Sequence, residues 1–205
     1  MGGYPLIIGI AGKTGAGKNY VASILEQKGW RTLDLDPVGH RALDALSAEV
    51  EERLGPGLLS SDGSVNRRLL GERVFGSPQA LQLLEGITYP WIEKQTRLWL
   101  EEQPDIPAAV HGVNLHKTSL VKDCRFILWV SAPLRTRRQR VMRRDSKGWK
   151  ELLGRFRSQR RLGPKLFSRN AEIYKVRNSG NDRRLRRQLN RILSRLDTGS
   201  SGRGQ

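Results

Sequence analysis

The sequence has few cysteines and no long apolar run, and both shortages narrow its possible functions. A single cysteine, Cys124, among 205 residues rules out an internal disulfide and is typical of a reducing compartment. It precedes an apolar run, so we expect it to be buried and inert. No apolar run approaches the roughly 20 residues of a membrane span, and the N-terminus does not resemble a secretory signal. We therefore expect a cytoplasmic protein with no membrane partner.

Acidic residues are also scarce. The chain has 20 Asp and Glu against 37 Lys and Arg, which gives a formal net charge of +17 at pH 7. Such an excess favours a polyanionic partner, and phosphorylated small molecules would account for part of it. Nucleic acid is the alternative. Against it, the sequence has no nucleic-acid-binding motif, and few aromatic residues lie among its basic residues.

Glycine is abundant in residues 12–19, which read Gly-Lys-Thr-Gly-Ala-Gly-Lys-Asn. They follow the apolar run 6–10, typical of a buried parallel strand, and precede a segment with helical periodicity. Glycines at this spacing allow backbone N–H groups to form an anion cradle, to which the helix adds the positive end of its dipole. Lys18 can then reach the terminal phosphates of a nucleoside triphosphate, so the stretch predicts a phosphate-binding loop.

Asn19 departs from the phosphate-loop pattern, which has Ser or Thr after the lysine so that a hydroxyl coordinates magnesium. An amide oxygen can approach a metal directly or through water. The alternative is that Asn19 caps the helix that begins there.

Asp36 follows the second predicted strand, residues 30–35. Ligands of open α/β sheets bind beyond the carboxyl ends of the strands, so we expect Asp36 to face the phosphate loop. Its carboxylate could orient a hydroxyl, accept its proton, or hold metal-bound water. It could also, or instead, cap the next helix with Pro37 at the first position. Asp34 is a second candidate.

The remaining segments alternate between helical and strand patterns. We expect a helical lobe over residues 37–104 that covers a substrate, with Arg67 as a phosphate clamp or a solvated side chain. His111 and His116 have no nearby Cys or Asp and do not predict a metal site. The predicted helices are 38–54, 66–75, 78–100 (bent near Tyr89-Pro90), one starting at 133, 146–159 and 182–196; the predicted strands are 106–110, 126–131 and 173–177; residues 198–205 are expected to be disordered.

Arginines dominate the helix that starts at Pro133 and recur up to residue 161. In phosphoryl transfer, arginines that close over the nucleotide neutralise the charge on the transferred group. The alternative is a solvated basic face, and two or three working arginines would suffice.

In their order and spacing, these motifs resemble those of dephospho-CoA kinases over nearly the whole chain. The resemblance rests on the phosphate loop, on Asp34-Leu35-Asp36 where the family has Asp-Ala-Asp, on Asp62-Gly63 with Arg67, on Leu84-Glu85 with Ile87-Thr88-Tyr89-Pro90, on Ala132-Pro133 leading to Arg140 and Arg144-Asp145, on Arg155 with Gln159, and on Asn178-Ser179-Gly180.

The resemblance implies an α/β fold, namely an adenylate-kinase-like P-loop NTPase with three α/β/α layers and five parallel strands. One kinase domain, residues 1–197, would contain a core (1–36, 105–133 and 166–197), a substrate lobe (37–104) and a lid (134–165). The implied reaction is ATP-dependent phosphorylation of the ribose 3′-hydroxyl of dephospho-CoA, the last step of coenzyme A synthesis. ATP and Mg²⁺ would be the cofactors, and the protein would be a monomer or weak oligomer.

The loop motif and the resemblance together assign roles to individual residues. Lys18, Asp36 and Arg140 are the expected catalytic residues; Gly12, Lys13, Thr14, Gly15, Ala16, Gly17, Lys18, Asn19, Arg140 and Arg144 would bind the nucleotide; Asp36, Arg67, Tyr89 and His111 would bind the acceptor; and Asn19, with Asp36 through water, would bind the metal.

Four positions depart from the family pattern. Asn19 replaces the hydroxyl residue, Tyr89 stands where the family has His before Pro, and His111 and Lys117 replace two acids at the end of the third strand. These changes remove three plausible supports for magnesium or substrate. The chain is then either a divergent working enzyme or a weakened nucleotide-binding protein whose basic surface binds nucleic acid. A kinase for another nucleoside or nucleotide is a third hypothesis.

Overall fold

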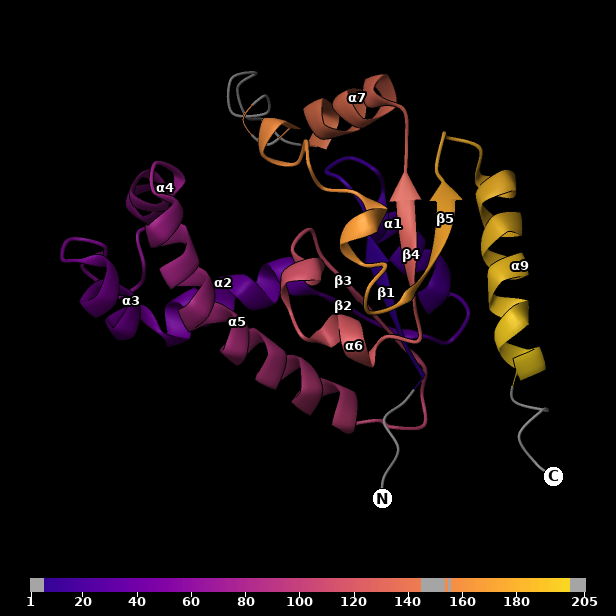
Figure 1. The fold of residues 1–205 in the computed structure, drawn as a ribbon, viewed down its shortest axis with the longest axis horizontal. Coiled ribbons are helices and arrows are strands. Elements are labelled where there is room, and N and C mark those ends of the chain that lie inside the picture. Colours follow the sequence, from indigo (N-terminus) through magenta and orange to yellow (C-terminus); the bar gives the residue numbers. More distant parts are fainter. Residues whose placement is uncertain (1–5, 145–153, 155, 200–205) are drawn as a thin grey trace. The chain divides into compact units, whose positions relative to one another are not determined.

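The structure is a computed structural model that describes residues 6–144, 154 and 156–199 (Figure 1). Its centre is a five-stranded parallel sheet in the order β2-β3-β1-β4-β5. The strands are β1 (Ile7–Ala11), β2 (Arg31–Asp34), β3 (Ala108–His111), β4 (Phe126–Ser131) and β5 (Glu172–Arg177). The predicted α/β fold with five parallel strands is confirmed.

The three inner strands are buried along nearly their whole length, as expected for a parallel sheet covered on both faces. In β1, Ile10 pairs with His111 on one side and with Leu128 on the other. Because the strands are parallel, the loop after β1 leaves the sheet at the same edge as the carboxyl ends of β3 and β4. This register positions the site described below.

Helices α1 (Lys18–Glu26) and α9 (Asp182–Gly199) pack on the sheet through apolar stripes. Leu185, Leu189 and Ile192 of α9 recur at helical spacing and are buried in the same cluster as Ile8 and Leu128. The predicted end of this helix at residue 196 was too early, because α9 continues to Gly199. Disorder of the tail, residues 198–205, stays a prediction, and residues 200–205 lie outside the described residues.

Three further helical segments connect the strands: η1 (Leu115–Lys117) and α6 (Leu120–Asp123) precede β4, and α7 (Leu134–Arg144) follows it. The backbone N–H of Arg137 donates to the carbonyl of Pro133 (3.0 Å), so Pro133 precedes the first turn and the helix begins at Leu134, one residue later than predicted. A short turn, η2 (Pro164–Leu166), leads into β5. Most of the predicted 146–159 helix, with Arg155, lies outside the described residues.

The chain divides into two compact units, of which residues 34–104 form one. This unit consists of α2 (Leu35–Ala45), α3 (Ser47–Leu54), α4 (Arg67–Phe75) and α5 (Pro78–Glu101), packed around Val50, Leu58 and Leu70. The single helix predicted over residues 38–54 is wrong: it starts at Leu35 and breaks at Leu46 into two helices. That the unit serves as a substrate lobe stays a prediction.

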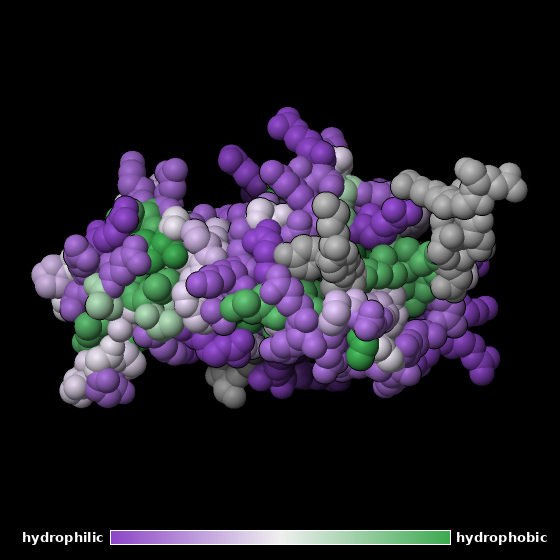
Figure 2. Space-filling model, turned by 90° about the horizontal axis from the view of Figure 1, so that it is seen from below, coloured by the Kyte–Doolittle hydropathy of each residue, from purple (hydrophilic) through white to green (hydrophobic). Residues whose placement is uncertain are grey.

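Within α5, Pro90 lies inside the helix and cannot donate to the carbonyl one turn earlier, at Gly86. Gly86 is exposed, so water can satisfy that carbonyl. None of the helices in the described residues combines the length and the hydropathy needed to cross a membrane. On the face shown in Figure 2, hydrophilic residues cover most of the surface between smaller apolar patches.

Candidate active site

The loop between β1 and α1 forms the core of the site. Gly15 and Gly17 have φ angles of 76° and 93°, in the left-handed region that favours glycine. Helix α1 starts at Lys18 with Gly17 as its N-cap, so no side chain of the cap residue occupies the first backbone N–H groups. These groups and the helix dipole suit an anion. Lys18 itself is only 9% exposed, where its charge is weakly screened.

Asn19 lies one residue inside α1 and is exposed. Because Gly17 is the N-cap, the alternative that Asn19 caps the helix is wrong. It lies in the first turn of α1, at the helix end that faces the loop, and its metal-binding role stays a prediction.

Asn178, directly after β5, holds the loop from one side. Its side chain is buried, and its Nδ2 donates to the carbonyl of Ala16 (3.0 Å). Arg140 of α7 donates from Nη2 to Asn178 Oδ1 (3.0 Å) and from Nη1 to the carbonyl of Ala16 (3.3 Å). Arg140, predicted as a nucleotide residue, is therefore fixed beside the loop by an amide that touches both.

Arg137 is a second arginine at the loop that the sequence did not single out. Its Nε donates to the carbonyl of Thr14 (2.9 Å), and burial lowers the pKa of its guanidinium. Arg137 and Arg140 are three residues apart and so share one face of α7, a spacing that could have identified the pair. Arg144, by contrast, is exposed in the last turn of the helix.

Gln159 closes the loop from the other side. Its Oε1 accepts from the backbone N–H of Thr14 (2.7 Å), and its Nε2 donates to Thr14 Oγ1 (2.7 Å). Next to it, the carbonyl of Arg160 accepts from Lys13 Nζ (3.2 Å). The segment that the resemblance assigns to the lid thus contacts the phosphate loop directly.

Two cavities adjoin the loop. One, of about 340 Å³, is bounded by Lys13, Trp129 and Arg137 on one side and by Leu162 and Pro164 on the other. The second, of about 230 Å³, opens next to Gly17 and is lined by Tyr20, Arg140, Asn178, Gly180 and Asp182.

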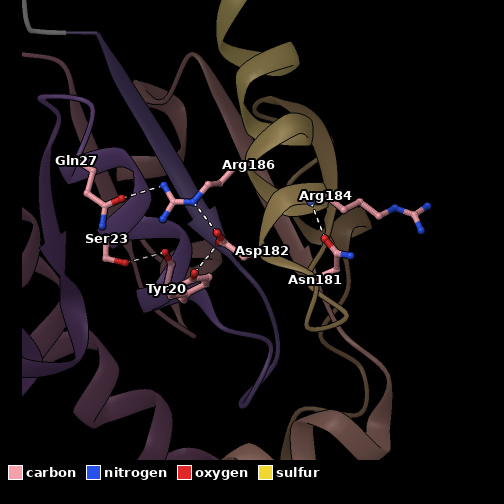
Figure 3. Close-up of polar contacts among 7 residues, drawn as sticks. All are labelled: Tyr20, Ser23, Gln27, Asn181, Asp182, Arg184 and Arg186. Atoms are coloured by element: carbon pink, nitrogen blue, oxygen red, sulfur yellow. Dashed lines mark hydrogen bonds and ion pairs between the residues drawn. The ribbon is translucent and has the colours of Figure 1, made fainter.

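The wall of the second cavity is held by a chain of polar contacts between α1 and α9 (Figure 3). Tyr20 donates its hydroxyl to Asp182 Oδ1 (2.6 Å), and Arg186 pairs with Asp182 Oδ2 (2.8 Å) and donates to Gln27 (2.9 Å). The hydrogen bond from Tyr20 lowers the pKa of Asp182, which keeps this carboxylate charged. Sequence reasoning missed this network, because its members are about 160 residues apart in the chain.

Asp36 belongs to the other unit and is exposed in the first turn of α2. The cap of this helix is Asp34, whose carboxylate accepts from the backbone N–H of Asp36 (3.1 Å). The alternative that Asp36 caps the helix, with Pro37 at its first position, is therefore wrong. Its carboxylate is not used by the cap, so the catalytic role stays a prediction.

Two further predicted acceptor residues lie in the same unit. Arg67 pairs with Asp44 (3.3 Å), and both side chains are about half exposed. Such surface pairs contribute about 0–1 kcal/mol, so a phosphate could displace Asp44 at little cost. Burial, followed by the nearby charge of Glu85, raises the pKa of Tyr89, so its hydroxyl stays protonated.

His111 ends β3 and is buried, whereas Lys117 is exposed at the end of η1. In the part of the chain that the structure describes, no group of three or more His, Cys, Asp and Glu is placed to hold a metal ion. Cys124 is buried as predicted, and burial raises its pKa to about 12, which makes the thiol unreactive.

Comparison with known proteins identifies the family of this chain. The family model for dephospho-CoA kinase matches residues 6–181. This chain belongs to the dephospho-CoA kinase family. It is 33% identical to dephospho-CoA kinase of Thermus thermophilus over 97% of this chain and 96% of the relative, and 32% identical to that of Treponema pallidum over 92% and 94%. The predicted family and enzyme class, a kinase, are confirmed.

Solved structures share the fold of this chain. The crystal structure of TT1252 from Thermus thermophilus matches with a TM-score of 0.79 and 31% identity over 94% of this chain and 98% of that one. Shikimate kinase from Acinetobacter baumannii has a TM-score of 0.51 and 16% identity over 95% and 94% of the two chains, a likeness that shows the fold alone. A dephospho-CoA kinase uses ATP, so the loop is the expected place for its phosphates.

Asn178→Ala tests whether the amide between Arg140 and Ala16 shapes the loop. Removing it leaves the buried Ala16 carbonyl and the partly buried Arg140 guanidinium without this partner. We expect this to cost about 1–3 kcal/mol of unfolding free energy and to weaken ATP binding about tenfold, equivalent to about 1.4 kcal/mol. Urea unfolding and titration calorimetry measure the two effects. The matched control is Ser179→Ala, at the exposed neighbouring position. Equal ATP affinity of the two variants would contradict this role of Asn178.

Proposed function

We propose that this chain transfers the γ-phosphoryl group of ATP to the ribose 3′-hydroxyl of dephospho-CoA and releases CoA and ADP. The observation that carries the proposal is the phosphate loop at residues 12–18, clasped by two arginines of α7, in a member of this kinase family. A cytoplasmic location forms part of the proposal and agrees with the single, buried cysteine.

ATP would bind with its phosphates in the loop and its base in the cavity beside Gly17. The backbone N–H groups at the start of α1 and the amine of Lys18 would surround the β- and γ-phosphates. Arg140 bounds the same cavity and contacts the loop, so its guanidinium is near where charge develops during transfer. We assign Arg137 a similar contribution, and Tyr20 offers a flat ring to the base.

Asp36 would act as the general base on the acceptor. An exposed carboxylate at the start of α2 can accept the proton of the 3′-hydroxyl as its oxygen attacks the γ-phosphorus and the bond to the β-phosphate oxygen breaks. Arg67 would bind an acceptor phosphate in place of Asp44, and Tyr89 would donate a hydrogen bond. His111 is the remaining candidate for contact with the acceptor.

The donor set suits Mg²⁺ held mainly by ATP. Magnesium prefers oxygen ligands and keeps several waters, with only one or two ligands from protein. Asn19 would provide one amide oxygen at the start of α1, and Asp36 would act through water. When bound with ATP, the ion neutralises phosphate charge.

Asn19→Ser tests this assignment by introducing the hydroxyl of the common loop pattern. We expect the free Mg²⁺ concentration that gives half the maximal rate to fall several-fold, because a hydroxyl is the ligand that the pattern normally provides. Initial rates against free Mg²⁺ at saturating ATP measure this change. Asn190→Ser, on the exposed surface of α9, is the control. If the magnesium dependence of Asn19→Ser were unchanged, Asn19 would not be a ligand of the metal.

The proposed reaction is tested with purified protein, ATP, Mg²⁺ and dephospho-CoA. CoA and ADP should form in equal amounts by mass spectrometry, and an acceptor that lacks the 3′-hydroxyl should give neither. Adenosine and AMP, supplied as acceptors in parallel, test the hypothesis of another nucleoside or nucleotide kinase. Turnover of either one in preference to dephospho-CoA would overturn the proposal.

A further inference from the structure

The outward face of α9 carries a row of arginines. Arg184, Arg187 and Arg191 lie at positions i, i+3 and i+7 of the helix, hence on one face; we call them the α9 arginine stripe. With Gln188 they line a surface hollow of about 520 Å³. The apolar residues of α9 are packed against the sheet on its other side.

The stripe has no carboxylate partner among the described residues. The acid at the start of the helix, Asp182, pairs with Arg186 and Tyr20. Figure 3 shows the side chain of Arg184 extending away from that network. Like charges one helical turn apart repel each other, so three such arginines around one hollow present an unneutralised positive field to an anion.

The helix that carries the stripe is tied to the edge of the sheet. Strand β5 lies at the edge of the sheet, and Gln188 is tied to it: the backbone N–H of Arg177 donates to Gln188 Oε1 (3.1 Å), and Gln188 Nε2 donates to the Arg177 carbonyl (3.1 Å). The stripe is therefore anchored on a fixed part of the core.

We propose that the α9 arginine stripe binds the sugar-phosphate backbone of nucleic acid without sequence preference, in addition to the kinase activity. Arginine's planar fork matches phosphate oxygens in pairs. From Arg184 to Arg191 the helix rises about 10.5 Å, at 1.5 Å per residue, which spans about three phosphates of a strand spaced about 3.4 Å along its axis. Contacts from these arginines to phosphates would fix the position of the strand but carry no sequence information, so no sequence preference is expected.

The composition of the surface argues against two other occupants. Membrane-surface helices bury large apolar side chains in the lipid, and protein interfaces are anchored by aromatic and apolar residues. Within the described residues, none of the exposed large apolar side chains lies on β5 or α9. Strongly hydrophilic side chains project at the right-hand end of Figure 2, the side on which Figure 1 shows α9. This surface is therefore suited to bind phosphate groups through charge and not to bind a lipid or an apolar protein surface.

The test is fluorescence anisotropy with labelled 20-nucleotide RNA, single-stranded DNA and duplex DNA of unrelated sequences, over a range of salt concentrations. The full chain is compared with the triple variant Arg184→Gln, Arg187→Gln, Arg191→Gln. We expect the variant to bind each probe at least about tenfold more weakly at 100 mM salt. Its log–log salt slope on single strands should be smaller by about 2, because three phosphate contacts are lost.

The matched control removes the same charge elsewhere: Arg41→Gln, Arg53→Gln, Arg68→Gln, three exposed arginines of residues 34–104. It should bind within about twofold of the unmodified protein. The single variant Arg187→Glu, with its fold checked by circular dichroism, should weaken binding in the same direction as the triple variant. Kinase turnover should be unchanged in all three, because none of them alters a residue assigned to the site.

Three outcomes would overturn the proposal. The stripe variant and the control could bind nucleic acid equally, which would mean that net charge and not the position of the arginines determines binding. The unmodified protein could bind no probe more tightly than about 10⁻⁴ M at physiological salt, the weak end of non-specific binding. Lastly, the stripe variant could lose binding only to vesicles containing anionic lipid, which would assign the surface to a membrane. A loss of nucleic acid binding confined to the stripe variants would support it.

Discussion

Asp36→Asn is expected to lower kcat for CoA formation by at least about a hundredfold, the lower end of what general base catalysis contributes. Asparagine has the same shape but cannot accept the proton of the 3′-hydroxyl. Because ATP would bind through the loop and the arginines of α7, its dissociation constant should stay within about twofold, in keeping with a loss of less than about 0.4 kcal/mol. Steady-state rates and titration calorimetry with ATP measure the two quantities separately.

Asp34→Asn is the matched control for this prediction. It removes a carboxylate two residues away, and asparagine caps helices about as well as aspartate, so α2 should keep its start. We expect its kcat to stay within about threefold of the unmodified protein, a difference of about 0.7 kcal/mol in activation free energy. A large loss in Asp34→Asn with a small one in Asp36→Asn would transfer the role of base to Asp34 and contradict the assignment.

Gly17→Ala is expected to abolish measurable ATP binding and to destabilise the fold. The residue has a φ of 93°, and a Cβ there would overlap the side-chain amide of Asn178. The backbone strain costs about 1–3 kcal/mol, and disruption of the buried hydrogen bond to Ala16 costs about 1–3 kcal/mol more. Urea unfolding measures the loss of stability, and calorimetry measures ATP binding.

Gly29→Ala separates strain from overlap. Gly29 also has a left-handed φ, 83°, but a Cβ there would meet no atom within 4 Å. This variant should lose only the strain energy of about 1–3 kcal/mol and bind ATP normally. If both variants bound ATP equally well, the contact between Gly17 and Asn178 would have no part in shaping the loop.

The sheet was predictable where apolar runs are bounded by turn residues. Strand β4 matches its predicted range, 126–131, because its buried run ends abruptly in Ala132-Pro133. Strand β3 starts two residues later than predicted, at Ala108. The prediction counted Ile106 as part of the buried run because it is apolar, but Ile106 is exposed. The break at Leu46 was missed because the apolar spacing continues across it, with Ala42 and Val50 both buried.

In the site, the local features could be inferred and the long-range contacts could not. The loop at residues 12–18 follows from glycine spacing between a strand and a helix, all within one stretch of chain. The hydrogen bonds of Thr14 to Gln159 and of Ala16 to Asn178 join residues 145 and 162 positions apart. Periodicity and propensity carry no information on such pairs, so only the order of family motifs pointed toward Gln159 and Asn178.

The most direct test of the proposed mechanism is a crystal structure with dephospho-CoA, Mg²⁺ and a non-hydrolysable ATP analogue. The quantity to measure is the distance from the Asp36 carboxylate to the 3′-hydroxyl oxygen, with the γ-phosphate analogue in the loop beside Lys18. We predict about 2.6–3.2 Å, or one bridging water. A carboxylate more than about 10 Å from that hydroxyl, far beyond hydrogen-bond reach, would contradict the assignment of Asp36 as the base.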